Sequence, residues 1–256
     1  MKIGIIGVGK MATAVIQGLR KGQDQLIISG SSLDRSKEIA EQLEVAYAQS
    51  HQDLLDQVDL VILGIKPQVY ETVLAPLTFK QPVMSMAAGV TLAKLAELVG
   101  TDLPIIRIMP NMNAQILKST TALTFNDNVR PDLKAKCQEI VASFGSCFEI
   151  AEKDFDTFTA LAGSSPAYIY LFIEAMAKAG VAHGLPKDKA LEIVSQTVLA
   201  SADQLLQGQD SPHSLIDKIC SPGGTTIAGL LELERTGLTA SVSAAIDKTI
   251  EKAKKM

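Results

Sequence analysis

The chain has 256 residues, of which 47% are hydrophobic, so it is long enough for one large domain or two modest ones, each with its own core. Its net charge of -4 argues against a general affinity for nucleic acid or for anionic membranes, because both carry negative charge themselves. Small molecules are therefore the expected partners.

The cysteines indicate a reducing compartment. Cys137, Cys147 and Cys220 are an odd number, and their spacings match no metal site or disulfide framework, so we expect no metal and a cytoplasmic location. We expect no signal peptide before the first strand. The apolar run 166–182 carries Glu174 and Lys178 and is too short to span a membrane comfortably, so it is predicted to be a buried helix of a soluble protein.

The chain opens with a predicted strand at residues 2–6, a glycine turn and a helix over residues 10–19. The turn and helix carry a GxGxxA motif in which Gly7 allows the tight turn, Gly9 leaves room for a pyrophosphate, and Ala12 lets the helix pack on the strand. Because a helix N-terminus attracts anions, residues Gly7, Val8, Gly9, Lys10 and Met11 are predicted to bind a dinucleotide.

The second predicted strand, residues 26–29, runs into "SGSSLDR". An acidic residue at this point would hold the ribose diol of NAD, whereas hydroxyl groups and an arginine suit the extra phosphate of NADP. Ser31, Ser32 and Arg35 therefore favour NADP(H) as the cofactor, with NAD(H) as the alternative. Ser31 and the residues after it also suit the N-cap of the next helix.

Further apolar runs at residues 58–65, 82–88, 104–109 and 146–150 are predicted to be strands. Their hydrophobicity is continuous, which is typical of strands covered on both faces in a parallel sheet. The first half is therefore predicted to be a Rossmann-like, doubly wound, mostly parallel α/β domain. Lys66, Ala88 and Asn111 follow three of these strands at the edge where such sheets bind ligands, which predicts the site of the nicotinamide and its substrate.

After residue 150 the pattern is helical, which predicts an all-α second domain. We expect domains at residues 1–150 and 151–256, with helices over 165–183, 187–206, 211–219, 225–234 and 238–254. Ser165-Pro166 and Ser211-Pro212 both suit an N-cap followed by proline in the first helical turn. The helix from Ser165 is apolar almost all round, so we expect a second copy of the chain to cover it in an obligate homodimer.

A second glycine turn, "SPGGTT", precedes the helix at residues 225–234. Gly223 and Gly224 expose backbone N–H groups next to the hydroxyl groups of Ser221, Thr225 and Thr226. The same physics as in the first turn predicts an anion site here, separate from the dinucleotide site.

The order of motifs GxGxxA, "IKPQ", "AAGVT", "MPN", "TALAGSSPAY" and "SPGGTT" resembles the pyrroline-5-carboxylate reductase family over nearly the whole chain. The resemblance implies a Rossmann domain, a helical dimerisation domain, dimers assembled into larger rings, and reduction of the cyclic imino acid 1-pyrroline-5-carboxylate to L-proline by NAD(P)H. The chain departs from the family pattern at His51, where the family commonly has an asparagine that contacts the adenosine ribose.

Carried over by position, the resemblance places cofactor contacts on residues 7–11, Ser31, Ser32, Lys66 and Ala88. It places substrate contacts on Gly223, Gly224, Thr225 and Thr226, with Ser221 shaping the loop and Glu152 as a weaker candidate near the imine. The imine nitrogen can be protonated in water before hydride arrives, so no strong acid/base is needed. Thr226 is then the expected catalytic residue, through a hydrogen bond to the ring nitrogen.

Two other functions are compatible with a Rossmann domain followed by helices. A β-hydroxyacid dehydrogenase-like oxidoreductase needs an asparagine four residues after a lysine in the first long helix of its second domain, but Lys178 is followed by Ala182 at that spacing. A non-catalytic NADP-binding regulatory protein would share the fold, because fold alone does not establish function.

Overall fold

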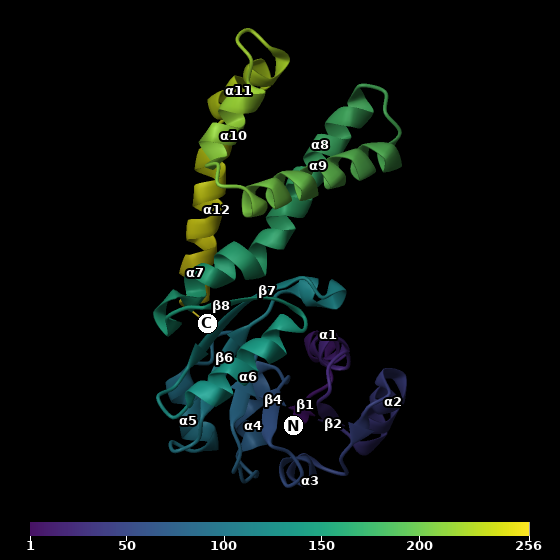
Figure 1. The fold of residues 1–256 in the computed structure, drawn as a ribbon, viewed down its shortest axis with the longest axis vertical. Coiled ribbons are helices and arrows are strands. Elements are labelled where there is room, and N and C mark those ends of the chain that lie inside the picture. The colour runs from purple at the N-terminus through teal and green to yellow at the C-terminus, as the bar shows by residue number, and fades with distance from the viewer. Residues whose placement is uncertain (256) are drawn as a thin grey trace. The chain divides into compact units, whose positions relative to one another are not determined.

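The computed structural model describes residues 1–255, which fall into two compact units (Figure 1). The first comprises residues 1–163 and 252–255, and the second comprises residues 164–251. Residues 151–163, which follow the last strand, thus pack with the first unit.

The first unit is built on one eight-stranded sheet with the strand order β3-β2-β1-β4-β5-β6-β7-β8. Strands β1 to β6 are parallel to one another, β7 is antiparallel to β6, and β8 is parallel to β7. The predicted doubly wound, mostly parallel α/β fold is therefore confirmed. The strands are β1 Lys2–Ile6, β2 Gln25–Ser29, β3 Ala46–Tyr47, β4 Leu60–Leu63, β5 Val83–Ser85, β6 Ile105–Met109, β7 Ser119–Phe125 and β8 Gly145–Glu149.

Helices cover both faces of this sheet and bury a separate hydrophobic cluster on each. Along β4, Leu60 and Ile62 belong to one cluster and Val61 and Leu63 to the other, which explains the continuous apolar runs of the sequence. The helices are α1 Lys10–Leu19, α2 Leu33–Leu43, α3 His51–Leu55, α4 Tyr70–Leu74, α5 Leu92–Val99, α6 Pro131–Ala142 and α7 Phe155–Phe158, with short 3₁₀ turns η1 Pro67–Val69, η2 Met112–Ile116 and η3 Glu152–Asp154.

Strands β3 and β7 were not predicted. β3 has only two residues, and β7 carries polar side chains on its buried face: Ser119 and Thr121 are buried and their hydroxyl groups hydrogen-bond each other at 2.8 Å. Such a strand lacks the apolar run that marks its neighbours.

The second unit is all helical and has little core of its own. Its helices are α8 Ser165–Ala182, α9 Lys187–Gln207, α10 Pro212–Ile219, α11 Thr225–Arg235 and α12 Leu238–Ala253, the last of which ends in the first unit. Among the described residues, only Ala177, Ala190 and Val194 of this unit are buried. Large apolar side chains are exposed instead, such as Leu171 at 71% and Leu206 at 85%.

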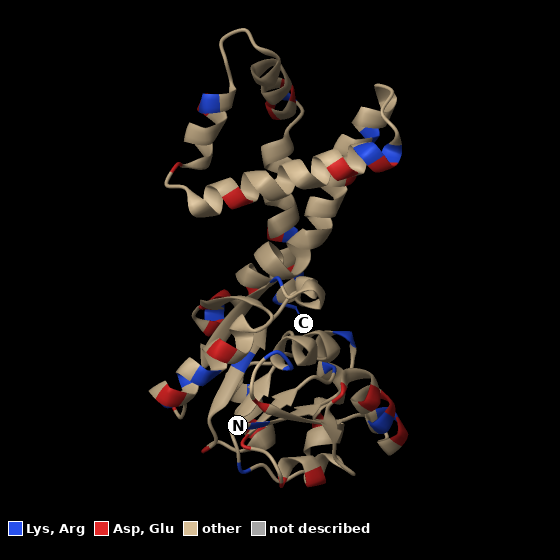
Figure 2. Ribbon diagram, turned by 45° about the vertical axis from the view of Figure 1, so that its right-hand side comes forward, with Lys and Arg blue, Asp and Glu red and all other residues tan. Residues whose placement is uncertain are grey.

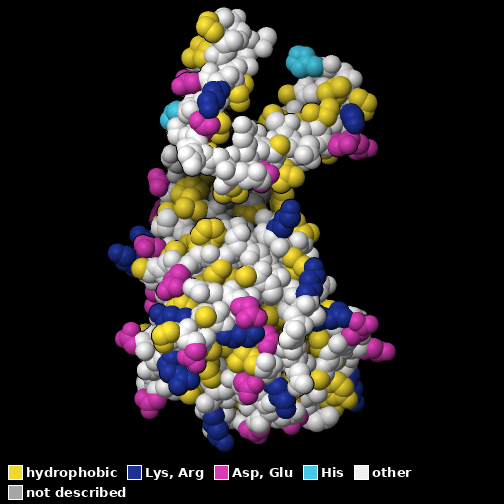
Figure 3. Space-filling model, viewed as in Figure 1, with side chains coloured by type: hydrophobic (Ala, Val, Ile, Leu, Met, Phe, Trp, Pro, Cys, Tyr) yellow, Lys and Arg dark blue, Asp and Glu magenta, His cyan; other side chains and the backbone are white. Residues whose placement is uncertain are grey.

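The surface of this unit is correspondingly apolar. Figure 2 shows long stretches of its helices without charged residues, and Figure 3 shows hydrophobic side chains on its surface. Among the described residues, no helix combines the length and hydrophobicity that crossing a membrane requires. Such a surface fits a second protein chain better than water.

Helix α8 begins at Ser165 and α10 begins directly after Ser211, as predicted. The N-cap at Ser211 is confirmed, whereas the N-cap at Ser165 is wrong. The Ser211 hydroxyl accepts a hydrogen bond from the N–H of Ser214 at 3.2 Å, as an N-cap does. Ser165 instead follows a π-helical segment, η4 Thr159–Ser164, so the chain is already helical when it reaches Pro166. Pro166 lies in the first turn of α8, where a residue without an N–H is tolerated.

Candidate functional site

The first glycine loop connects β1 to α1 and is held firmly at Gly7. This residue has φ of 94°, and its N–H donates to the carbonyl of Ser29 at 2.8 Å. A Cβ placed on Gly7 would lie 2.8 Å from the backbone of Gly64, so only glycine fits this turn. The conformation of this turn therefore fixes the direction in which α1 begins.

Gly9 leaves open space at the N-terminus of α1. It is the N-cap of α1, no side chain caps the helix, and a Cβ added to Gly9 would meet nothing within 4 Å. The helix itself sits close to the sheet, since a Cβ on Gly64 would be 2.8 Å from that of Ala12. Uncapped N–H groups beside an open cradle fit a pyrophosphate.

Of the predicted residues after β2, Arg35 lines the cavity beside this cradle, whereas Ser31 and Ser32 do not. The Ser32 hydroxyl caps α2 by accepting from the N–H of Arg35 at 3.2 Å, while Ser31 is exposed. The Arg35 guanidinium pairs with Glu38 at 2.6 Å on the surface, an interaction weak enough to be exchanged for a phosphate. A cavity of about 760 Å³ is lined by Gly9, Lys10, Arg35 and their neighbours, so the structure brings the two cationic side chains together with the glycine loop.

His51 begins α3 and lies against the end of β2. Its Nδ1 is 2.7 Å from the hydroxyl of Ser29, and burial lowers the pKa of its imidazole. Since the carbonyl of Ser29 also receives the N–H of Gly7, one residue links the glycine turn to His51. His51 was singled out in the sequence because it departs from the family pattern, but its contact with Ser29 was not predicted.

The other predicted cofactor residues follow neighbouring strands. Lys66 is exposed after β4, and Ala88 is half-buried after β5, next to Gly89 with φ of 75°. β4, β5 and β6 adjoin one another in the sheet, so Lys66, Ala88 and Asn111 share its carboxyl edge. Beneath this edge, the buried hydroxyl of Tyr70 hydrogen-bonds that of Ser85 at 2.9 Å, and burial raises the pKa of Tyr70 to about 12.

The Asn111 side chain forms hydrogen bonds to backbone groups of the protein itself. Its amide nitrogen donates to the carbonyl of Ala162 at 2.9 Å, and its carbonyl oxygen accepts from the N–H of Asn113 at 3.1 Å and of Thr120 at 3.4 Å. These bonds shape the loop after β6. A direct contact between Asn111 and the cofactor stays a prediction.

Glu152 is tied to two other elements of the first unit. Its Oε1 accepts from the N–H of Leu92, at the start of α5, at 2.7 Å and from Nη1 of Arg107 on β6 at 2.9 Å. The guanidinium of buried Arg107 also lies over the ring of Phe155, 4.4 Å from its centroid. Sequence reasoning missed Arg107, whose one signal was a charge inside the apolar run "PIIRIM".

The second glycine loop lies in the second unit between α10 and α11. Gly223 has φ of 69°, and Gly224 is the N-cap of α11, which no side chain caps. A Cβ on Gly224 would lie 2.4 Å from the Ser221 hydroxyl, so this serine packs where only glycine leaves room. Thr225 and Thr226 are exposed in the first turn of α11, so the structure brings all five predicted substrate residues of this loop together.

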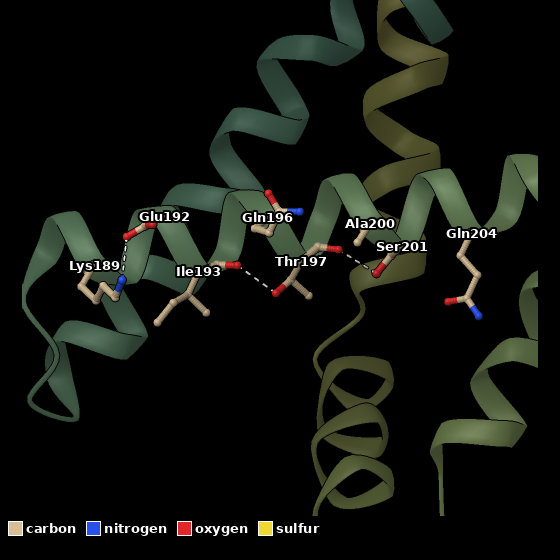
Figure 4. A pocket seen from close by; sticks show the side chains of 8 residues that line it. All are labelled: Lys189, Glu192, Ile193, Gln196, Thr197, Ala200, Ser201 and Gln204. Carbon is tan, nitrogen blue, oxygen red and sulfur yellow. Dashed lines mark hydrogen bonds and ion pairs between the residues drawn. The ribbon is translucent and has the colours of Figure 1, made fainter.

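A hollow of about 550 Å³ on α9 contains none of the predicted site residues. The side chains that line it lie along one face of that helix (Figure 4). The hydroxyl groups of Thr197 and Ser201 donate to carbonyls of their own helix at 2.8 Å. No group of three or more potential metal ligands occurs among the described residues.

The sheet order and the open glycine cradle at α1 are those of a Rossmann-type dinucleotide-binding domain. Residues 2–89 match the family model described as NADP oxidoreductase, coenzyme F420-dependent, and residues 152–256 match the one described as pyrroline-5-carboxylate reductase dimerisation. The pyrroline-5-carboxylate reductase from Aquifex aeolicus is 37% identical to the chain, and the match covers 100% of this chain and 97% of that protein. The one from Escherichia coli is 38% identical, and the match covers 100% and 98%. The chain therefore belongs to the pyrroline-5-carboxylate reductase family.

Solved structures agree with this membership. A 1-pyrroline-5-carboxylate reductase from Streptococcus pyogenes superposes with a TM-score of 0.94 at 72% identity, covering 100% of this chain and 99% of that one. A pyrroline carboxylate reductase from Plasmodium falciparum, with NADP bound, superposes with a TM-score of 0.88 at 30% identity and covers 100% and 97%. The family resemblance expected from the motifs is confirmed.

Proposed function

We propose that this chain reduces 1-pyrroline-5-carboxylate to L-proline with NADPH as the electron donor, the last step of proline biosynthesis. The end-to-end match to reductases of that name, at 72% identity in one case, carries the proposal. Hydride adds to the imine carbon, and the ring nitrogen keeps the proton it has taken from water. The products are proline and NADP⁺.

The first unit holds the cofactor, and the bound cofactor supplies the hydride. The N–H groups of α1 receive the pyrophosphate beside Gly9, and Ser31, Ser32 and Arg35 receive the 2′-phosphate. Lys66, Ala88 and the loop shaped by Asn111 lie at the carboxyl edge of the sheet, where they would hold the nicotinamide ring. These roles are supported by the open cradle at Gly9 and by the cavity that Lys10 shares with Arg35.

The second glycine loop holds the substrate. The glycine pair Gly223-Gly224 and the uncapped N-terminus of α11 suit a small carboxylate, and the neighbouring hydroxyl of Thr226 suits the ring nitrogen. The carboxylate then fixes the imine ring by one end while Thr226 orients its C=N bond. Glu152, whose carboxylate is already tied to Leu92 and Arg107, is less suited to direct substrate contact.

The second unit also joins the chains. We propose that residues 1–150 bind NADP(H), that residues 151–256 form the homodimer and bind substrate, and that dimers assemble into a larger homo-oligomer. The exposed apolar side chains of α8 and α9 support the dimer. The three cysteines without a disulfide fit a cytoplasmic location.

One assay tests the activity. Purified protein is mixed with NADPH and 1-pyrroline-5-carboxylate, the loss of nicotinamide absorbance is followed, and proline is identified by chromatography. We expect turnover that depends on both reactants. If NADPH binds but no cyclic imine is reduced, the proposal fails and a regulatory NADP-binding protein becomes the better interpretation.

A further inference from the structure

A positively charged side chain is buried in the sheet of the first unit. Arg107 lies on β6 with 6% of its surface exposed, and its side chain is a guanidinium cation. A buried cation costs free energy unless its partners are well placed, and an apolar side chain at such a position is often as stable or more so. In Arg107 the Nε atom finds no hydrogen-bond partner among the described residues. Stability alone is therefore a poor reason for an arginine here.

Arg107 is connected through Glu152 to the end of the loop that follows β5. Nη1 donates to Oε1 of Glu152, and the same oxygen accepts the N–H of Leu92, the first residue of α5. A carboxylate at a helix N-terminus is stabilised by the N–H groups there. Glu152 thus anchors the start of α5, and Arg107 anchors Glu152 to β6.

The segment held in this way carries Ala88, which the proposed function assigns to the nicotinamide end of the cofactor. Between β5 and α5 lie residues 86–91, including Ala88 and Gly89. One end is fixed by the sheet, where the N–H of Ala87 donates to the hydroxyl of Ser85 at 3.3 Å. The other end is fixed by Glu152. A cavity of about 460 Å³ runs past Gly89, Thr91, Arg107 and Glu152, so the ion pair and the loop border the same space.

We propose that Arg107 and Glu152 are positioning residues, which hold the loop of residues 86–91 in the conformation that hydride transfer requires. The inference rests on the proposed function, and it gives Glu152 a role through α5 rather than through the substrate. Displacing a reacting group by about 1 Å can cost roughly 100-fold in rate. A looser loop should therefore slow turnover while leaving the substrate loop of the second unit intact.

A change at Leu92 tests the hydrogen bond alone. Proline is favoured at the first position of a helix, and the preceding Thr91, with φ of -77° and ψ of 162°, has the extended backbone that precedes proline. Leu92→Pro therefore removes the N–H that Glu152 accepts with little harm to α5. Leu92→Ala is the matched control, because it removes the same side chain and keeps the N–H.

We expect kcat to fall about 10- to 100-fold in Leu92→Pro, Glu152→Ala and Arg107→Met. Leu92→Ala should stay within about threefold of the unchanged protein. KM for the imine should change less than about threefold in every variant. The kinetic isotope effect with NADPH deuterated at C4 should rise in the three slow variants, because hydride transfer becomes more fully rate-limiting. Thermal unfolding and sedimentation of each variant show whether it is folded and assembled.

The outcomes separate the possible roles. A raised KM in Glu152→Ala alone, with kcat kept in Arg107→Met, would mean that Glu152 binds the substrate directly. A lower unfolding temperature with unchanged kcat and isotope effect would mean that the pair is only structural. Either result overturns the positioning role, whereas an unchanged protein that reduces no imine would refute the proposed function itself.

Discussion

Gly9→Ala separates cofactor binding from folding more sharply than any other single change. Gly9 has φ of -74° and ψ of 175°, which alanine adopts readily, and the added Cβ meets nothing within 4 Å. Alanine lowers the entropy of the unfolded chain by about 0.4–1 kcal/mol but is a poorer N-cap than glycine by a similar amount. The two effects oppose each other, so the free energy of unfolding should change by less than about 1 kcal/mol, or roughly 2–4 °C in the unfolding temperature.

The effect on the cofactor should be much larger. The methyl group would occupy the open space beside the N-terminus of α1, where we propose that the pyrophosphate binds. If it costs one hydrogen bond from a backbone N–H to a charged oxygen, the loss is about 1.5–3 kcal/mol. That corresponds to a roughly 10- to 150-fold higher Kd for NADPH.

Two companion variants give the contrast. Gly22→Ala makes the same chemical change at the far end of α1, where a Cβ would meet only the carbonyl of Leu19 at 3.4 Å, so binding should not change. Gly7→Ala puts alanine at φ of 94° against the backbone of Gly64 and should destabilise the fold by about 2 kcal/mol or more. Fluorescence titration with NADPH and thermal unfolding measure the two quantities. Unchanged NADPH affinity in Gly9→Ala would show that the pyrophosphate does not lie against this residue.

Three further changes test other parts of the site. Arg35→Ala should raise the Kd for NADPH about tenfold and leave the Kd for NADH unchanged. Glu38→Ala, which removes the partner of the Arg35 guanidinium, should not raise the Kd for NADPH. Equal effects of Arg35→Ala on the two Kd values would contradict the 2′-phosphate role. Thr226→Ala should lower kcat about 100-fold with little change in NADPH affinity, and Thr226→Ser should retain most activity; a loss confined to NADPH binding would refute the assignment. Burial lowers the pKa of His51 below its unfolded value of 6.5, so the unfolded chain takes up this proton first as the pH falls. The free energy of unfolding should therefore decrease from about pH 6.5 downward to the lowered pKa, and denaturant titrations should find a weaker decrease in His51→Asn; an equal decrease would place the titration elsewhere.

The sequence could predict the features that depend on neighbouring residues. The glycine turn before α1, the apolar strands β1 and β4, and the cap at Ser211 each follow from a few consecutive side chains with a strong local preference. The edge shared by Lys66, Ala88 and Asn111 also followed, because the carboxyl ends of parallel strands lie together.

The features that were missed depend on residues far apart in the chain. Glu152 and Arg107 are 45 residues apart, and Ser29 and His51 are 22 apart, so no local pattern connects them. At Ser165 a strong local signal, serine before proline, was overridden by the π-helical segment that precedes it. Tertiary contacts therefore set the details of the site that propensity and spacing leave open.

The two glycine loops differ in what supports them, and this difference ties catalysis to assembly. α1 carries buried side chains on one face and packs through Ala12 against the sheet, so one chain suffices to shape the cofactor cradle. α10 and α11, which carry the second loop, bury no side chain within one chain among the described residues. We therefore expect a second copy of the chain to support their geometry. A charge at exposed Leu171, as in Leu171→Glu, should yield a monomer by sedimentation that binds NADPH within about threefold of the unchanged protein but reduces no imine, while Leu171→Met remains active. Turnover by a monomer would show that one chain alone sets the substrate loop.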